Sequence, residues 1–549
     1  DRAGGYRRLW DRAGGRLVRR LEGHTDAVTS VHFSRDGKRL LTSSYDATAR
    51  LWNVETGELI RTFAGHDWWV WSAAFSPDEQ RIVTASHDGS VIVWTTDTGE
   101  PNPVPFLGHR KDGSQTPVFA AVFAPDGSVH DRLARKCFPV AQERSWLAAA
   151  SVADLPSFET PAGRLGVPRA RTGARWLVSG NEAAGAGAIR GGVRFVAAYP
   201  ITPATEMLEW LSPALARVGG ALLQAEDELA SVNMIIGASY GGVPSLTATA
   251  GPGLALMTEG IGLAVAAEVP IVVVDVMRGG PSTGIPAKSE QSDLSFAVAG
   301  LHGDAPRLVL APTSIADCLP TTQWAVELAE ALQSPAIVLS DQFMGQSRAV
   351  VDRPADATVA GKRLVADANA PDYKRYRDTD SGVSPMAVPG TPGTVYTADG
   401  LSHTEAGIPS SGARDHLLQL DKRARKLARH DYGRRWADLE GDGNAAVITF
   451  GSTTAAVREA LARAAAQGVH ARLVALRLLA PLRREALAEA LAGVDRVLVV
   501  EQNHSGQLLR HLRAEFDLPA RQSSFRRPGP LPLRPGELAD AIIAWRTAP

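Results

Sequence analysis

The sequence predicts two unlike parts: an N-terminal all-β segment built from a repeated unit, and a larger α/β part from residue 176 onward. Three observations predict this division. Six of the 12 Trp residues fall within the first 94 positions. A Gly-His pair recurs there at a spacing of 42 residues. After residue 175, short apolar strands alternate with Ala-rich helices, as expected for a parallel sheet.

Composition narrows the class of protein. The 549 residues are 44% hydrophobic, enough for several cores, and 58 Lys+Arg against 59 Asp+Glu leave a formal net charge of -1. We therefore expect no nucleic-acid partner. Cys137 and Cys318 lie too far apart for a CxxC motif, which argues against a disulfide scaffold or a cysteine-ligated metal centre.

The most apolar stretch, residues 260–277, is interrupted by Glu268 and Asp275 and is shorter than the about 20 clean residues of a membrane helix. The first residues show no charged segment followed by an apolar one, as a secretory signal would have. We expect a protein of the reducing cytoplasm with no membrane partner.

The repeat is marked by His and Trp. His24 and His66 follow Gly, and Trp52 and Trp94 each come 28 residues after their His. Short alternating strands and tight turns lie between these marks. This resembles the WD-repeat family of β-propellers. The resemblance implies one buried polar network per unit, formed by His24, Ser44, Asp46 and Trp52, and by His66, Ser86, Asp88 and Trp94.

Only two complete units are present, with a fragment before them and a single strand, 118–123, after them. A propeller needs at least four blades. We therefore expect residues 1–127 to form an incomplete propeller without a catalytic role, and 128–175 to be a linker. Trp68, Trp69 and Trp71 either pack between blades, which we favour, or form a partner-binding face.

In the α/β part, a polar cluster follows each of four predicted strands. In doubly wound parallel sheets, ligands bind at the carboxyl ends of the strands. We expect the functional site there. The strands and their clusters are 195–198 with 199–203, 222–225 with 226–228, 245–250 with 251–253, and 270–275 with 277–284.

The clusters read Tyr-Pro-Ile-Thr-Pro at 199–203, Gln-Ala-Glu-Asp-Glu at 224–228 and Arg-Gly-Gly-Pro-Ser-Thr-Gly at 278–284. They resemble the α subunit of 2-oxoacid:ferredoxin oxidoreductases, the 2-oxoglutarate type most closely, and segments 290–294, 339–342 and 501–507 support the resemblance. It implies three parts. They are a pyrimidine-binding thiamine-diphosphate-type domain over 176–365, a connecting segment over 366–443, and a transketolase C-terminal-like α/β domain with a role in subunit assembly over 444–549.

The resemblance also implies roles for single residues. Glu228 would be the catalytic acid beside the aminopyrimidine ring of thiamine diphosphate. Tyr199, Pro200 and Ile201, with Glu228, would contact the cofactor. Thr202 and Arg278 would bind the 2-oxoacid.

Each role has a plainer alternative. Glu226, Asp227 and Glu228 also suit the first turn of a helix, where they would complement its dipole. Thr202 also suits a helix N-cap, with a Pro at the first helical position. Arg278 would otherwise be an ordinary surface side chain. Ser282 and Lys288 are weaker substrate candidates.

Three further patterns indicate structure rather than function. The small residues of 185–190 indicate close helix packing, because the last Gly of a dinucleotide fingerprint is missing. Gly441-Asp442-Gly443 precedes a strand and indicates a turn. The basic run 422–429 indicates a solvated helix face.

For the assembly, the resemblance implies a β subunit that shares thiamine diphosphate and carries Mg2+ and an iron–sulfur cluster. The expected reaction converts 2-oxoglutarate, coenzyme A and oxidised ferredoxin into succinyl-CoA, carbon dioxide and reduced ferredoxin, and the chain alone would be inactive. A pyruvate or branched-chain 2-oxoacid enzyme is an alternative. So is a non-catalytic WD-repeat interaction protein.

Overall fold

The computed structural model describes most of the chain as two compact units that divide between Arg175 and Trp176. The described residues are 5–10, 17–101, 110–111, 114–115, 118–123, 129–133, 175–355, 361–519, 521–529 and 531–547.

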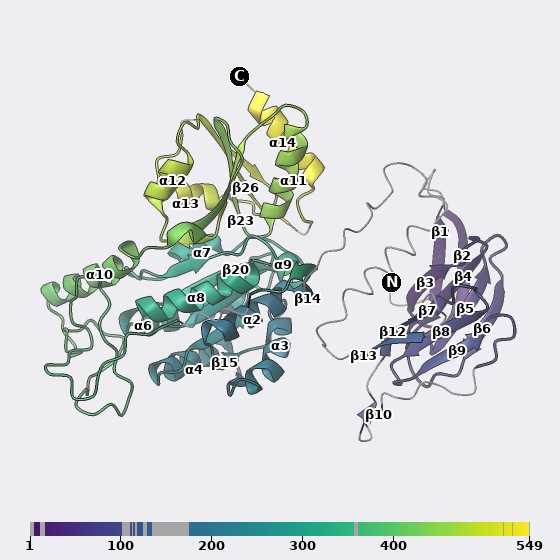
Figure 1. Ribbon diagram of the computed structural model, residues 1–549, viewed down its shortest axis with the longest axis horizontal. Coiled ribbons are helices and arrows are strands. Elements are labelled where there is room, and N and C mark those ends of the chain that lie inside the picture. Colours follow the sequence, from purple (N-terminus) through teal and green to yellow (C-terminus); the bar gives the residue numbers. More distant parts are fainter. Residues whose placement is uncertain are drawn as a thin grey trace. The chain divides into compact units, whose positions relative to one another are not determined.

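The N-terminal unit is all β (Figure 1). Its largest sheets are antiparallel, one with the order β3-β4-β5-β6 and one with the order β7-β8-β9, and hairpins β1-β2, β10-β11 and β12-β13 accompany them. The predicted all-β class is confirmed. Strand β13 lies within the segment expected to be a linker, where it pairs with β12. The strands are β1 (Gly5–Trp10), β2 (Leu17–His24), β3 (Val28–Phe33), β4 (Arg39–Ser44), β5 (Thr48–Asn53), β6 (Leu59–Ala64), β7 (Val70–Phe75), β8 (Arg81–Ser86), β9 (Val91–Thr95), β10 (Arg110–Lys111), β11 (Ser114–Gln115), β12 (Val118–Phe123) and β13 (Val129–Leu133).

The polar network of each repeat forms, but with a different hydroxyl from the one predicted. His24 bonds Asp46 at 2.7 Å and Thr42 at 2.8 Å, and the indole of Trp52 donates to the same Thr42 hydroxyl at 2.8 Å. Ser44 lies one pleat further toward the turn and donates instead to a backbone carbonyl, that of Asp26.

The second repeat shows the same difference. His66 and Trp94 meet at Thr84, and Ser86 donates to the backbone of the preceding loop. The predicted Ser44 and Ser86 are therefore wrong as network members. Trp69 and Trp71 pack against Tyr45, which follows β4, with ring centroids 4.7 and 5.3 Å apart, as expected for packing between blades. Trp68 is 51% exposed.

The C-terminal unit begins with a seven-stranded sheet of order β16-β15-β17-β18-β20-β19-β25. Every pair is parallel except β19-β25. Its central strands are buried along their whole length, which explains their continuous apolar sequences. The strands are β15 (Phe195–Ala198), β16 (Ala221–Gln224), β17 (Ser245–Thr249), β18 (Val272–Met277), β19 (Leu308–Leu310), β20 (Ala336–Asp341) and β25 (Leu478–Ala480), with a separate pair of β14 (Arg175–Ser179) and β21 (Arg348–Asp352).

Helices cover this sheet, and none of the helices in the described ranges is both long and apolar enough to cross a membrane. The predicted α/β class is confirmed. The helices are α2 (Gly180–Gly191), α3 (Thr205–Ala216), α4 (Glu228–Tyr240), α5 (Gly251–Leu256), α6 (Thr258–Ala266), α7 (Leu294–Ala299), α8 (Cys318–Leu332) and α9 (Gln342–Gln346).

A five-stranded sheet of order β22-β24-β23-β26-β27 follows, with α11 and α14 on one side and α12 and α13 on the other (Figure 1). Residues 441–443 form the predicted turn before strand β23, with Gly441 at φ 74°. The elements are α10 (Ala413–Ala428), β22 (Ala437–Glu440), β23 (Ala445–Phe450), α11 (Thr453–Ala465), β24 (Arg472–Leu476), α12 (Arg484–Ala490), β26 (Arg496–Glu501), α13 (Gln507–Glu515), β27 (Arg521–Arg526) and α14 (Pro535–Thr547).

The small residues of α2 serve close packing, as predicted. A Cβ on Gly187 would lie 2.2 Å from the backbone oxygen of Leu319 in α8.

We expect Gly187→Ala to lower the free energy of unfolding by about 1–3 kcal/mol, because a backbone atom must move. Gly262→Ala in α6 is the matched control. Nothing lies within 4 Å of its added Cβ, so it should raise that free energy by about 0.5–1 kcal/mol. Denaturant unfolding curves for both variants measure this difference, and equal effects would contradict the packing argument.

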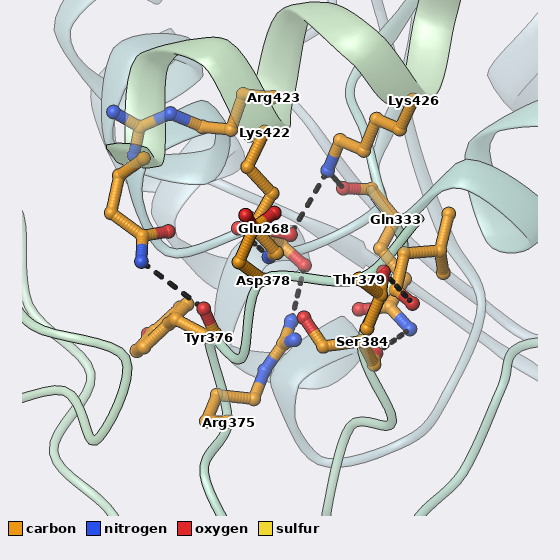
Figure 2. A network of polar contacts seen from close by, with 12 residues as sticks. Glu268, Gln333, Arg375, Tyr376, Asp378, Thr379, Ser384, Lys422, Arg423 and Lys426 are labelled. Atoms are coloured by element: carbon orange, nitrogen blue, oxygen red, sulfur yellow. Dashed lines mark hydrogen bonds and ion pairs between the residues drawn. The ribbon is translucent and has the colours of Figure 1, made fainter. Parts of the chain in front are cut away.

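Three residues of the basic run, Lys422, Arg423 and Lys426, are buried, so the prediction of a solvated face is wrong for them, whereas Arg429 is exposed. Lys422 is 0% exposed and Lys426 is 2% exposed, and their ammonium groups bind the two carboxylate oxygens of Glu268 at 2.5 and 3.2 Å (Figure 2). Arg375 of the connecting segment donates to the backbone carbonyl of Glu268 at 2.8 Å. This cluster of one carboxylate and several cations attaches α10 and the connecting segment to the end of α6.

Burial opposes the ionised form of Glu268, but Lys422, Lys426 and Arg375 overcome it and hold the pKa of this carboxyl below its usual range. Burial also lowers the pKa of Lys426 to about 7. Removing the one carboxylate would leave its cations facing one another in the interior. Glu268 therefore supports the fold of this region.

Candidate active site

The four polar clusters meet at one edge of the seven-stranded sheet. Strands β16, β15, β17 and β18 are adjacent and parallel, and their registers pair Ala198 with Gln224 and Thr249 with Asp275. Their carboxyl ends therefore lie side by side. The structure thus brings together the segments that were predicted to form the site.

Glu228 is the first residue of α4, and its side chain is almost fully buried at 6% exposure. The neighbouring Asp227 caps the helix by accepting a hydrogen bond of 2.6 Å from the amide of Ala230. The carboxyl of Glu228 makes no hydrogen bond with any described residue. Capping is thus the task of Asp227, and the Glu228 carboxyl remains available to a ligand.

The first turn of α5, which follows β17, lies directly against Glu228. A Cβ added to Gly253 would lie 2.6 Å from the Oε1 atom of Glu228 and 2.1 Å from the hydroxyl of Thr249. Only a glycine permits this approach. The Gly-Pro-Gly cluster at 251–253 therefore forms one wall around the buried carboxyl.

Arg278 and Thr202 lie in contact. The Nη1 atom of Arg278 donates a hydrogen bond of 2.5 Å to the backbone carbonyl of Thr202. The hydroxyl of Ser292 donates a hydrogen bond of 2.7 Å to the backbone carbonyl of Arg278. Arg278 is only 6% exposed, so it is not an ordinary surface arginine, and its buried Nε has no hydrogen-bond partner among the described residues.

The turn that carries Thr202 differs from the N-cap alternative. Helix α3 begins at Thr205, and its N-cap is Ala204, so Thr202 does not cap the helix. Thr202 is exposed and Tyr199 is 40% exposed, whereas Pro200 and Ile201 are partly buried. Ser282 and Lys288 lie in an exposed loop. The structure therefore leaves the hydroxyl of Thr202 free of a capping role.

Two of the three motifs that only supported the family resemblance, 290–294 and 501–507, have a structural role. Gln291 and Gln502 exchange hydrogen bonds of 2.8 Å between the thiamine-type part and the last domain. Gln507 donates to the carbonyl of Ser292 at 2.7 Å, one residue beyond Gln291. The same Ser292 holds Arg278, so this interface supports the site. The sequence motifs pointed to these residues, but only the structure shows which residues they contact.

The fold and this edge define a thiamine-diphosphate-binding α/β protein, and the family models agree. The model described as "Pyruvate flavodoxin/ferredoxin oxidoreductase, thiamine diP-bdg" matches residues 186–421, and "Pyruvate:ferredoxin oxidoreductase core domain II" matches residues 443–525. "WD domain, G-beta repeat" matches 15–53 and 57–95, which confirms the N-terminal repeats.

Several relatives are 2-oxoacid oxidoreductase subunits. The 2-oxoglutarate synthase subunit KorA of Methanothermobacter marburgensis is 33% identical over 68% of this chain and 99% of its own length. The 2-oxoacid:ferredoxin oxidoreductase 2 subunit alpha of Aeropyrum pernix is 35% identical over 70% of this chain. This chain spans 63% of the Aeropyrum protein and 55% of a similar Saccharolobus solfataricus subunit.

A solved structure agrees in fold and sequence. It is a 2-oxoglutarate:ferredoxin oxidoreductase from Magnetococcus marinus with 2-oxoglutarate, coenzyme A and succinyl-CoA bound. The TM-score is 0.67 at 38% identity, over 74% of this chain and 70% of that one. The chain belongs to the family of 2-oxoacid:ferredoxin oxidoreductase α subunits.

Proposed function

We propose that this chain is the α subunit of an enzyme that oxidatively decarboxylates 2-oxoglutarate. With coenzyme A and oxidised ferredoxin, the products are succinyl-CoA, carbon dioxide and reduced ferredoxin. The observation that carries the proposal is the pairing of buried Arg278 with Thr202 at the edge where Glu228 lies. The relatives named as 2-oxoglutarate synthase subunits favour this substrate over pyruvate or a branched-chain 2-oxoacid.

The residues at this edge fit thiamine diphosphate. The carboxyl of Glu228 is buried and makes no hydrogen bond with a described residue. The backbone of Gly253 lies so close to this carboxyl that a side chain would not fit between them. When bound, thiamine diphosphate supplies a carbon nucleophile for the 2-oxo carbon. Glu228 would hold a proton between its carboxyl and a nitrogen of the aminopyrimidine ring. Tyr199, Pro200 and Ile201 would line the cofactor from the turn after β15.

Arg278 and Thr202 would orient the 2-oxoacid. The hydrogen bond from Nη1 to the Thr202 carbonyl fixes the plane of the guanidinium, and Nε and Nη2 make no hydrogen bond with the described residues. A planar guanidinium suits a carboxylate. The Thr202 hydroxyl would donate to the substrate carboxylate or to its 2-oxo oxygen.

A β subunit would complete the enzyme. We propose that it binds the diphosphate through Mg2+ and carries the iron–sulfur cluster, with ferredoxin as the electron acceptor. This chain has only two cysteines, and Gly441-Asp442-Gly443 forms a turn before β23. The blade networks fully engage His24 and His66, so the N-terminal repeats receive no catalytic role.

Substituting Arg278 by Lys tests the substrate role. In the complex with a β subunit, Arg278→Lys should raise KM for 2-oxoglutarate by about tenfold or more, because an ammonium cannot reproduce the planar two-point contact. KM for coenzyme A should change little. Steady-state ferredoxin reduction with each substrate varied in turn gives both constants. Equal increases would indicate a general defect and contradict the role.

A further inference from the structure

Asp275 is a buried carboxyl at the centre of the seven-stranded sheet. It lies on β18, is 0% exposed, and pairs in register with Thr249 of β17 and Leu339 of β20. No described hydrogen-bond donor reaches either of its carboxyl oxygens. Its partner is the carboxyl of Asp293, at the start of α7, and one Asp293 oxygen is likewise buried without a donor.

Two adjacent buried carboxyls satisfy each other only if a proton lies between them. Burial, followed by the proximity of Asp293, raises the pKa of Asp275 well above its usual range. Burial also raises the pKa of Asp293 to about 6. The charge of Glu290 also raises the pKa of Asp293, whereas the charge of Arg278 lowers it. Asp341, at the end of the neighbouring β20, accepts hydrogen bonds at Oδ1 from the hydroxyl of Ser289 and the amide of Met344, while its Oδ2 is buried without a donor among the described residues.

The pair lies directly behind the site. A Cβ on Gly251 would be 2.6 Å from an oxygen of Asp293, and Gly253 in the same first turn of α5 lies against Glu228. On its other side, Asp293 follows Ser292, whose hydroxyl holds the carbonyl of Arg278. Asp275 precedes Arg278 by three residues on the same strand and its extension. The pair therefore lies next to the segments that carry or contact both Glu228 and Arg278.

We propose that Asp275 and Asp293 share one proton, and that the protonated pair positions Glu228 and Arg278. Loss of the proton to solvent would leave two like charges behind the Gly-Pro-Gly cluster and would draw the Arg278 guanidinium toward Asp293. The pair is a set of positioning residues and touches no substrate. The inference rests on the proposed function for the roles of Glu228 and Arg278, but the proton itself is tested separately.

Infrared spectroscopy of the full chain tests the shared proton. At about pH 7, well above the ordinary pKa of an aspartate, the wild-type spectrum should contain the carbonyl stretch of a protonated carboxyl. Asp275→Asn should remove it, because the amide now donates to an ionised Asp293. Asp540→Asn, an exposed change on α14, is the matched control and should keep the band. A wild-type spectrum without the band would overturn the proposal, whatever the enzyme's substrate.

Binding of thiamine diphosphate to the complex with a β subunit tests the positioning. Wild-type affinity should fall toward alkaline pH as the pair loses its proton, by about tenfold if binding shifts the pKa of the pair by one unit. The Asp275→Asn complex should lose much less, because its amide cannot ionise. Calorimetric titration with thiamine diphosphate measures both. Parallel profiles for the two proteins would refute positioning.

These outcomes separate the inference from the proposed function. A protonated carboxyl and the predicted affinity profile, together with no turnover of any 2-oxoacid, would refute the proposed function and leave the pair standing. Normal turnover without the infrared band would do the reverse.

Discussion

Substituting Glu268 by Gln should lower the free energy of unfolding of the C-terminal unit by about 3–5 kcal/mol, as expected when one partner of a buried ion pair is removed. Glu268 is 0% exposed and bonds both Lys422 and Lys426 through its carboxylate. A neutral amide would leave these ammonium groups, with Arg375 nearby, buried without a counter-charge. Denaturant unfolding of the full chain, followed by a probe of the C-terminal unit, measures the change.

Glu259→Gln is the matched control, because Glu259 lies on the same helix, α6, but is exposed. Its effect should stay within about 0.5 kcal/mol, as for most surface changes. A loss below about 1 kcal/mol for Glu268→Gln would place it among surface pairs and contradict the structural role.

Glu228→Gln should reduce turnover of the complex with a β subunit by about 100-fold or more, the usual scale for loss of an acid–base catalyst. An amide keeps the size of the side chain but cannot hold the proton facing the aminopyrimidine ring. The measurement is 2-oxoacid-dependent reduction of ferredoxin at saturating thiamine diphosphate.

Glu226→Gln provides the comparison, because Glu226 belongs to the same acidic cluster but is exposed. It should keep nearly the full rate. If Glu228→Gln retained more than about a tenth of the wild-type rate, the catalytic assignment would be wrong. Comparable losses in both variants would point to the helix start as a whole.

The sequence predicted most of the parallel strands well because they are short runs rich in apolar residues, each followed by a turn. Strand β15 has the predicted bounds, and those of β16 and β17 lie within one residue of the predicted ones. The polar clusters were placed at the strand ends on the same grounds, and the sheet order then brings them together. Strand β18 was predicted over 270–275 but begins and ends two residues later, at Val272–Met277, although it is buried along its whole length.

The errors concern polar residues whose partners are distant in sequence. Lys422 and Lys426 lie on one face of α10, but their partner Glu268 is far away in the sequence. Glu268 and Lys422 are 154 residues apart. No local pattern predicts that contact. Asp275 interrupted an apolar run, and only the packing of α7 reveals Asp293 beside it.

The repeat networks show a finer limit. Thr42 and Ser44 lie on the same face of β4, because side chains two positions apart point the same way. Alternation alone therefore cannot choose between them. The rings of His24 and Trp52 lie beside Thr42 and both hydrogen-bond its hydroxyl, so Thr42 is the network member.

The most direct test of the central claim is to combine the full chain with a β subunit of the family and follow ferredoxin reduction. The account predicts reduction that requires 2-oxoglutarate, coenzyme A and thiamine diphosphate together, forms succinyl-CoA, and is absent for the chain alone. Failure of every 2-oxoacid to support reduction by a complex that contains bound thiamine diphosphate would contradict it.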